Sequence, residues 1–408
     1  MSLKVRLFLG VFLFASQVAF PQLTTNSSIS LITVGSGQEV FTAFGHSALR
    51  ISDPDLGIDN IYNYGTFSFN KGFYLRFTKG ELNFWLSTAP FYRAFYSWTV
   101  YENRTVTQQV LNLNHNQKNA LFGYLENNAL PQNSVYRYDY FYDNCSNRID
   151  AALKKVLGEN IKFSPESIAQ KHNTTGTSIR QLTHGYLLQN PWGELGIETC
   201  LGIDMDKKIT ADQFKFLPDY LMWNYDEAKI RSNGTWEPLV KEKVVLFQAL
   251  NNASPPNHQF SPKAIFGFVL VLSCLLSLPA LHKTLFARLF DFTLFLTSGA
   301  VGLLLLFLWF FTTHHSQINL NILWANPFNL VVSFLLFSKK RSPIFLKMSL
   351  VNGLLLALVL VFWTILPQRL NNAYLLICFT LLIRCFANYW FSKASSNKIK
   401  TAQSIKGL

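Results

Sequence analysis

The sequence is poor in acidic residues over its last third and poor in cysteine throughout. After position 260 it has 13 Lys and Arg residues but a single acidic residue, Asp291. From 21 to 260 it has 21 basic and 22 acidic residues, so the net charge of +13 comes almost entirely from the C-terminal part. A neutral N-terminal part without a basic stripe argues against nucleic-acid binding. The C-terminal excess carries information on membrane topology instead.

Only five cysteines are present, and three of them lie in apolar segments, where we expect them to pack inertly. A disulfide between the other two, Cys145 and Cys200, is the alternative to a reactive thiol at Cys145, since exported pairs often form one. The sequence has no metal-binding or nucleotide-binding motif and no internal repeat. We therefore expect no cofactor and no metal.

The first 20 residues are typical of a secretory signal. Lys4 and Arg6 precede a short apolar run at 7–15, and small residues follow near position 19. An N-terminal membrane anchor is the alternative. In either case the sequence predicts export of residues 21–258 as a periplasmic domain.

Residues 259–392 are predicted to form a transmembrane domain, followed by a basic cytoplasmic tail at 393–408. About five apolar segments approach the length of a spanning helix, although the third is short. They are 264–281, 289–311, 322–337, 345–366 and 373–391. With the N-terminal domain outside, the inner loops and tail hold ten basic residues and the outer loops only Arg369, in agreement with the positive-inside rule. The expected location is the bacterial inner membrane.

Between 21 and 258 short strand-like and helical patterns alternate, which predicts an α+β domain with antiparallel hairpins. The predicted strands are 30–34, 47–52, 60–65, an aromatic-rich pair at 72–78 and 82–86, 105–113, and a strand-like run at 135–142. The predicted helices are 115–129, capped by Asn114, and 146–157.

Cys145 lies where the strand-like run meets the second predicted helix, in the stretch 140–148. A thiol at a helix N-terminus has a lowered pKa, which favours the reactive thiolate. His46, at the head of the strand 47–52, is the candidate general base, because a Cys and a His far apart in sequence can meet in the fold. A satisfied core histidine is the alternative for His46, and His184 is a weaker competitor for the role of base.

A Cys–His pair needs a third group to fix the imidazole tautomer. Asn63 is the candidate, with Tyr64 and Asp143 as alternatives. Backbone amides around Asn144 and Ser146 are candidates for stabilising an oxyanion. The order His, polar residue, Cys is the reverse of the papain order and suggests a circular permutation.

The predicted outer loop at 312–327 is rich in hydrogen-bonding side chains and faces the same side as Cys145. These side chains are His314, His315, Asn321, Trp324 and Asn326. The loop is therefore a candidate membrane-side substrate loop. Solvated histidines and an interfacial tryptophan are the alternative explanation.

Several of these segments resemble the Lnb-type lipoprotein N-acyltransferases of Bacteroidetes. The resemblance rests on residues 30–52, 62–67, 141–146, 190–192, 201–206, 216–218, 314–315 and 321–327. It covers nearly the whole chain. One departure is Asn147, where a threonine is expected more often.

This resemblance implies a permuted papain-like (NlpC-like) exported domain and transfer of a fatty acyl chain. The donor would be a phospholipid and the acceptor the free α-amino group of a diacylglyceryl-cysteine lipoprotein. Cys145 would form a thioester, with His46 as the base. An aromatic hairpin at 67–101 would touch the bilayer or line an acyl groove, with plain core packing as the alternative.

Two other classes of function remain open from the sequence. One is a membrane-anchored NlpC-like cysteine peptidase or amidase that acts on cell-wall peptides. The other is a non-catalytic membrane protein in which a Cys145–Cys200 disulfide staples a binding domain.

Overall fold

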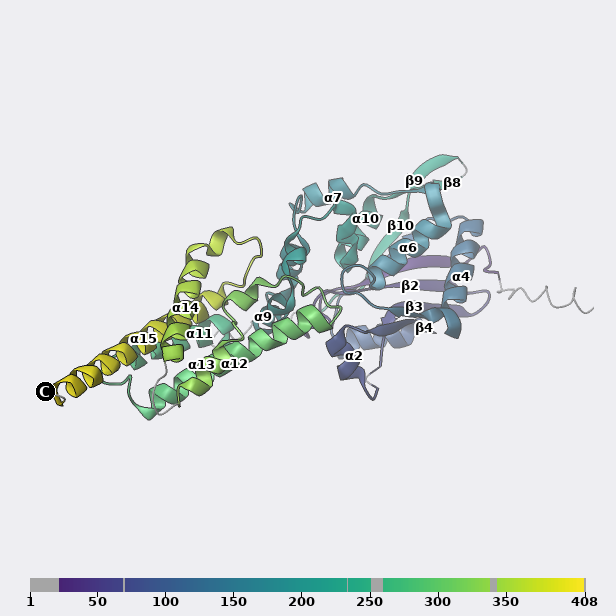
Figure 1. Ribbon diagram of the computed structural model, residues 1–408. Coiled ribbons are helices and arrows are strands. Elements are labelled where there is room, and N and C mark those ends of the chain that lie inside the picture. The colour runs from purple at the N-terminus through teal and green to yellow at the C-terminus, as the bar shows by residue number, and fades with distance from the viewer. Residues whose placement is uncertain (1–21, 69, 233, 251–259, 338–342, 407–408) are drawn as a thin grey trace, which may run out of the picture.

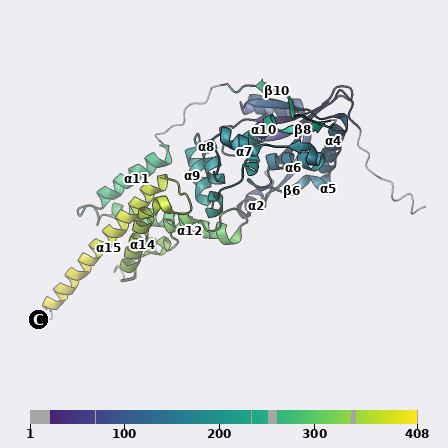
Figure 2. The ribbon, with the colours of Figure 1, turned by 90° about the horizontal axis from the view of Figure 1, so that it is seen from above.

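The computed structural model describes residues 22–68, 70–232, 234–250, 260–337 and 343–406. The predicted signal peptide lies outside these ranges, as do residues 251–259 and 338–342. The chain forms a sheet domain (22–250) and a helical domain (260–406), which occupy opposite ends of the molecule (Figure 1). The C-terminal end of α15 (Ala373–Lys406) lies farthest from the sheet domain in both views (Figures 1 and 2).

The sheet domain is organised around a seven-stranded sheet in which all paired neighbours are antiparallel. Its order is β10-β5-β1-β2-β3-β4-β6. The strands are β1 (Ser28–Val34), β2 (His46–Asp53), β3 (Ile58–Thr66), β4 (Asn83–Pro90), β5 (Val106–Leu111), β6 (Val135–Arg137) and β10 (Val240–Phe247). A small second sheet joins β7 (Ile161–Lys162), β8 (Lys229–Ser232) and β9 (Thr235–Pro238).

Successive side chains of the central strands alternate between two cores, as the period of two in a strand requires. Leu31 of β1 packs in the core that includes α4 (His115–Ala129), α6 (Cys145–Leu157) and α10 (Pro218–Glu227). Its neighbour Ile32 packs on the other face. The sheet is therefore buried on both sides, with α4 and α6 over one face (Figure 1).

The predicted helix 115–129 is confirmed as α4, whose N-cap Asn114 forms a capping box with Gln117. The predicted strand at 72–78 is wrong, because this segment forms the helix α2 (Phe73–Lys79). Glycines in the left-handed conformation bound it, Gly72 with φ 86° and Gly80 with φ 76°. Glycine reaches such angles without a steric penalty, and here it ends a helical turn rather than forming a hairpin.

The aromatic hairpin predicted at 67–101 is wrong for the same reason. After α2 and β4 the chain continues into α3 (Phe91–Tyr96) and a π-helical turn, Ser97–Tyr101. The strand-like run at 135–142 is shorter than predicted, because β6 ends at Arg137. The chain then turns through an isolated bridge between Asp139 and Asp143 before α6 begins.

Within the described residues of the helical domain, three helices are long and apolar enough to cross a membrane. They are α12 (Leu285–Phe311), α14 (Pro343–Val361) and the first part of α15, Ala373–Ala394. The first predicted span is a shorter helix, α11 (Pro262–Leu276), of 15 residues.

The third predicted span, 322–337, is not one helix. It consists of a 3₁₀ turn (Leu320–Leu323) and the seven-residue α13 (Asn329–Leu335). Pro327 lies between them, and the chain packs directly on α12 there. A Cβ at Gly302 would lie 2.0 Å from the carbonyl oxygen of Ala325. The backbone at Ala325 therefore packs directly on a glycine of α12, and the segment does not continue as one spanning helix.

A buried ion pair joins α15 to α12 inside the helical domain. Arg384 of α15 is fully buried and bonds Asp291 of α12 through Nε at 2.5 Å and Nη2 at 2.9 Å. Ser277 and Asn388 complete the network. The single acidic residue after position 260 thus neutralises the single arginine inside α15. Each charge therefore has a buried counter-charge, and neither is exposed to lipid.

Replacing Arg384 by methionine should lower the free energy of unfolding by about 3–5 kcal/mol, because Asp291 would remain buried without a partner. Thermal unfolding of the purified protein in detergent measures the loss. Lys393→Met, at an exposed position of the same helix, is the matched control. The double variant Arg384→Met/Asp291→Leu should recover much of the loss. Equal stability of Arg384→Met and the control would contradict the assignment.

Candidate functional site

The N-terminus of α6 carries the thiol, and Asn144 sets its position. The Asn144 side chain accepts hydrogen bonds from the amides of Ser146 at 2.9 Å and Asn147 at 3.1 Å. In return, Asn147 Oδ1 accepts from the Asn144 amide at 3.2 Å. Asn147, where the family resemblance favours threonine, therefore completes a capping box. Of the amides expected to stabilise an oxyanion, those of Asn144 and Ser146 are therefore already occupied.

The structure brings Cys145, His46 and Asn63 together from α6, β2 and β3. Asn63 Oδ1 lies 2.6 Å from Nε2 of His46. His46 and the Cys145 thiol are close enough for each charge to shift the pKa of the other group. Since Asn63 engages Nε2, we infer that Nδ1 faces the sulfur. The thiol is buried at 7% exposure.

The electrostatics of this site favour a thiolate–imidazolium pair. Burial opposes ionisation of Cys145, but the His46 charge and hydrogen bonds from His46, the Ser47 amide and the Ser146 side chain bring the pKa of the thiol below its ordinary value. Burial likewise lowers the pKa of His46, and the Cys145 charge and hydrogen bond more than reverse this, leaving that pKa raised. Each charge thus shifts the pKa of the other group in the direction that favours the ion pair.

The alternatives to Asn63 have other partners. Asp143 forms an ion pair with Arg148, whose Nη2 lies 2.5 Å from Asp143 Oδ2. Arg148, one turn beyond the thiol, is therefore neutralised by this carboxylate and stacks over the Tyr136 ring at 4.1 Å. Tyr64 is buried at 3% exposure in the core below α6. Of Asn63, Tyr64 and Asp143, only the Asn63 side chain bonds His46 in the described part of the chain.

Tyr136 of β6 is a site residue that the sequence analysis did not single out. Its hydroxyl is buried without a hydrogen-bond partner in the described chain. A Cβ built on Gly65, where φ is 91°, would lie 3.9 Å from Cys145 Cβ and 4.0 Å from this hydroxyl. Burial and the Cys145 charge raise the pKa of Tyr136, which keeps it protonated. Its tyrosine-rich context gave no signal that distinguished it from its neighbours.

His314 and His315 connect the helical domain to the segment that leads to the thiol. His315 Nε2 lies 2.8 Å from Asp139 Oδ2, and Asp139 Oδ1 accepts from the amides of Phe141 and Tyr142. Burial raises the pKa of Asp139, and the bond from His315 and these amides bring it below its ordinary value. His314 Nε2 lies 2.8 Å from the Phe77 carbonyl oxygen of α2.

Of the other residues of the predicted substrate loop, Asn321 bonds the sheet domain, and Trp324 and Asn326 form bonds within or next to the loop. Asn321 is buried and donates to the Thr199 carbonyl at 3.2 Å, and Trp324 donates to Asn321 at 2.9 Å. Asn326 accepts from the amide of Phe328 at 3.0 Å. Burial of Asn321 and Trp324 leaves them little surface for a substrate.

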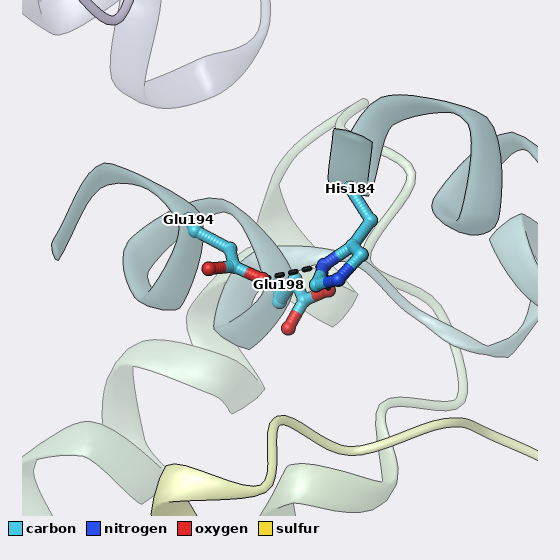
Figure 3. Close-up of side chains that lie close together, drawn as sticks. All are labelled: His184, Glu194 and Glu198. Atoms are coloured by element: carbon cyan, nitrogen blue, oxygen red, sulfur yellow. Dashed lines mark ion pairs between the residues drawn. The ribbon is translucent and has the colours of Figure 1, made fainter. Parts of the chain in front are cut away.

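Cys200 and His184 lie elsewhere. Both Cys145 and Cys200 are free thiols in the structure, so the stapling disulfide is not formed there. His184 of α8 (Ile179–Leu187) meets Glu194 and Glu198 of α9 (Pro191–Cys200), as Figure 3 shows. Their ligand atoms all lie within 4.8 Å of one another. This cluster is the arrangement in the described chain that could hold a metal ion.

Comparison with known families covers both domains. The model of the Lnb N-terminal periplasmic domain matches residues 21–185, and the model of the Lnb transmembrane domain matches residues 254–396. The chain belongs to the Lnb family. It is therefore a membrane protein with a periplasmic N-terminal domain, and its family suggests an acyltransferase. Neither the curated proteins nor the solved structures gave a match.

A pocket of about 290 Å³ lies between α2, β4 and β6 of this Lnb-family chain. Phe67, Phe73 and Phe84 line it together with polar residues such as Arg76 and Glu81. Phe84 stacks on Tyr138 with ring centroids 4.2 Å apart, and the Cys145 charge acts on Tyr138.

The ion pair predicts that iodoacetamide modifies Cys145 rapidly at pH 7, with a midpoint below the ordinary thiol pKa of about 8.5. In His46→Ala, burial would act without the opposing charge, so the pKa would rise and the rate at pH 7 fall about tenfold or more. Peptide mass spectrometry follows Cys145 alone. His172→Ala, whose ring stacks on Trp223, is the control. An unchanged rate in His46→Ala would contradict the pair.

Proposed function

We propose that this Lnb-family protein is a lipoprotein N-acyltransferase. It would move a fatty acyl chain from a phospholipid, through a thioester on Cys145, to the α-amino group of a diacylglyceryl-cysteine lipoprotein. The observation that carries the proposal is the grouping of Cys145, His46 and Asn63, in which Asn63 bonds His46 and His46 lowers the pKa of the thiol, in a chain whose residues 254–396 match an Lnb transmembrane domain. No cofactor is required for this chemistry.

In the first step the Cys145 thiolate attacks the ester carbonyl of the phospholipid. A C–S bond forms, and the ester C–O bond then breaks. The imidazolium of His46 gives its proton to the departing alkoxide, which leaves as a lysophospholipid alcohol. Asn63, bonded to Nε2, holds the ring so that Nδ1 stays directed at the sulfur.

In the second step the lipoprotein amine attacks the thioester carbonyl. A C–N bond forms, the C–S bond breaks, and the neutral His46 takes the proton that the amine loses. The products are an amide, the thiolate and the imidazolium. The starting charges of the site are thereby restored.

We assign stabilisation of both oxyanions to the Cys145 amide and the Tyr136 hydroxyl. The neighbouring amides of Asn144, Ser146 and Asn147 are used by the capping box. The Tyr136 hydroxyl is protonated, buried and without a partner in the described chain, as a preorganised donor should be.

The position of α2 supports access to a lipid. The chain leaves α12 at Phe311, and the Thr313 amide bonds the Lys79 carbonyl at 3.0 Å, so α2 lies at the end of a spanning helix. Figures 1 and 2 both place it there. Tyr74 and Leu75 of α2 are 75% and 64% exposed, as in an element that contacts the membrane surface.

We also propose the fold class, the cellular location and the number of membrane spans. The strand order and the positions of His46 on β2 and Cys145 on α6 support a permuted papain-like fold. Ten basic residues on one side support an inner-membrane protein with a cytoplasmic C-terminus. Five spans would require α11 and the 3₁₀–α13 segment to cross along with the three longer helices.

A cell-wall peptidase or amidase is the second candidate, because the same Cys–His chemistry serves peptide hydrolysis. The aromatic pocket and the exposed apolar face of α2 favour a lipid substrate over a muropeptide. Measuring both acyl release and muropeptide cleavage separates the two candidates.

The proposal predicts the mass of a lipoprotein N-terminus in cells that lack their own N-acyltransferase. Expression of this chain should add one fatty acyl group, because Cys145 carries the acyl chain between the substrates. Cys145→Ala, expressed at the same level in the membrane, should add none. Intact and peptide mass spectrometry measures both. If the parent protein adds no acyl group, the transferase proposal is wrong.

Tyr136→Phe removes only the hydroxyl and should lower the acyl-transfer rate about 100-fold, as loss of one oxyanion donor does. Alkylation of Cys145 at pH 7 should stay within about twofold, because the ion pair with His46 is intact. Tyr140→Phe, at an exposed tyrosine, is the control. A transfer rate equal to that of the control would rule out the hydroxyl as a donor.

A further inference from the structure

A cluster of one histidine and two glutamates lies between α8 and α9, apart from the thiol. Glu194 and Glu198 are four residues apart in α9, so both side chains lie on one face of the helix. Figure 3 shows both carboxylates directed at the imidazole of His184 on α8. Two like charges at this spacing destabilise a helix unless a cation lies between them.

Because the two carboxylates are buried, their mutual repulsion is stronger, and a neighbouring cation would stabilise them more. Glu194 is 9% exposed and Glu198 is 8% exposed. Glu198 Oε2 accepts from Asn371 at 2.7 Å, which orients the carboxylate. In the described chain, Glu194 has no side-chain partner outside the cluster. Lys263 acts on it through its charge but is exposed and forms no ion pair with it.

His184 lies beside both carboxylates. Nδ1 is 2.5 Å from Glu194 Oε1 and 3.7 Å from Glu198 Oε1. The three ligand atoms lie within 4.8 Å of one another, as ligands of one ion do.

We propose that His184, Glu194 and Glu198 bind a Zn²⁺ ion. One imidazole nitrogen and two carboxylate oxygens form a donor set that zinc accepts, at bonds of about 2.0–2.2 Å. Modest rotation of the side chains brings the three ligand atoms around one ion. The His184 side chain is 37% exposed, which leaves room for a water molecule as the fourth ligand.

The ion would join α8 to α9 where they contact the transmembrane domain. Asn371, which bonds Glu198, lies two residues before α15. The next residue of α9, Thr199, bonds Tyr374 of α15 and accepts from Asn319 at 2.7 Å. Zinc at this junction would stabilise the assembled protein whether or not it transfers acyl chains.

The test uses the full-length protein in detergent, stripped of metal and then given Zn²⁺. We expect about one zinc per chain by elemental mass spectrometry and a rise of about 5 °C in the unfolding midpoint. Glu194→Gln and His184→Gln should lose both effects. His172→Gln, a change of a histidine in the same domain, should keep them.

A purely structural ion pair gives the opposite pattern. If His184 and Glu194 simply form an ion pair, Glu194→Gln lowers the midpoint of metal-free protein and zinc changes nothing. If they form a zinc site, Glu194→Gln relieves repulsion, so the metal-free midpoint is at least that of the parent. Zinc binding that is absent from the parent, or equal in the parent and both ligand variants, would overturn the proposal.

Discussion

The rest of the structure depends on a close backbone contact between the two domains at Gly202. Its amide donates to the His315 carbonyl at 2.7 Å, and a Cβ at this position would lie 2.0 Å from the Gln317 carbonyl oxygen. Arg180, 1% exposed, holds this segment from behind by donating to the carbonyls of Leu201 and Gly202. Because no side chain fits between the two backbones, any other residue here would push the domains apart.

This contact also fixes the approach to the thiol. The loop that meets Gly202 includes His315, which bonds Asp139, and Asp139 in turn holds the amides of the turn before α6. The N-terminus of α6 is therefore held from two sides, by Asn144 within the sheet domain and by His315 from the helical domain. The transmembrane part is thus a structural component of the site as well as an anchor.

Local signals in the sequence predicted local structure well and distant partners poorly. The helix at 115–129 and the position of Cys145 at a helix start follow from capping residues and apolar spacing. The helix α2 was missed, since aromatic residues suit strands and the deciding factor is the conformation of Gly72 and Gly80. Pairings such as Arg384 with Asp291 join segments 93 residues apart, which no periodicity encodes.

The depth of the thiol bears on which reaction the site can perform. A thioester that faced bulk water would hydrolyse, so a transferase must keep water away until the amine arrives. Cys145 is 7% exposed, and Phe84 of the pocket near α2 stacks on Tyr138. A thiol enclosed in this way suits the acyltransferase that the Lnb family suggests. A peptidase, whose second substrate is water, gains nothing from such an enclosure.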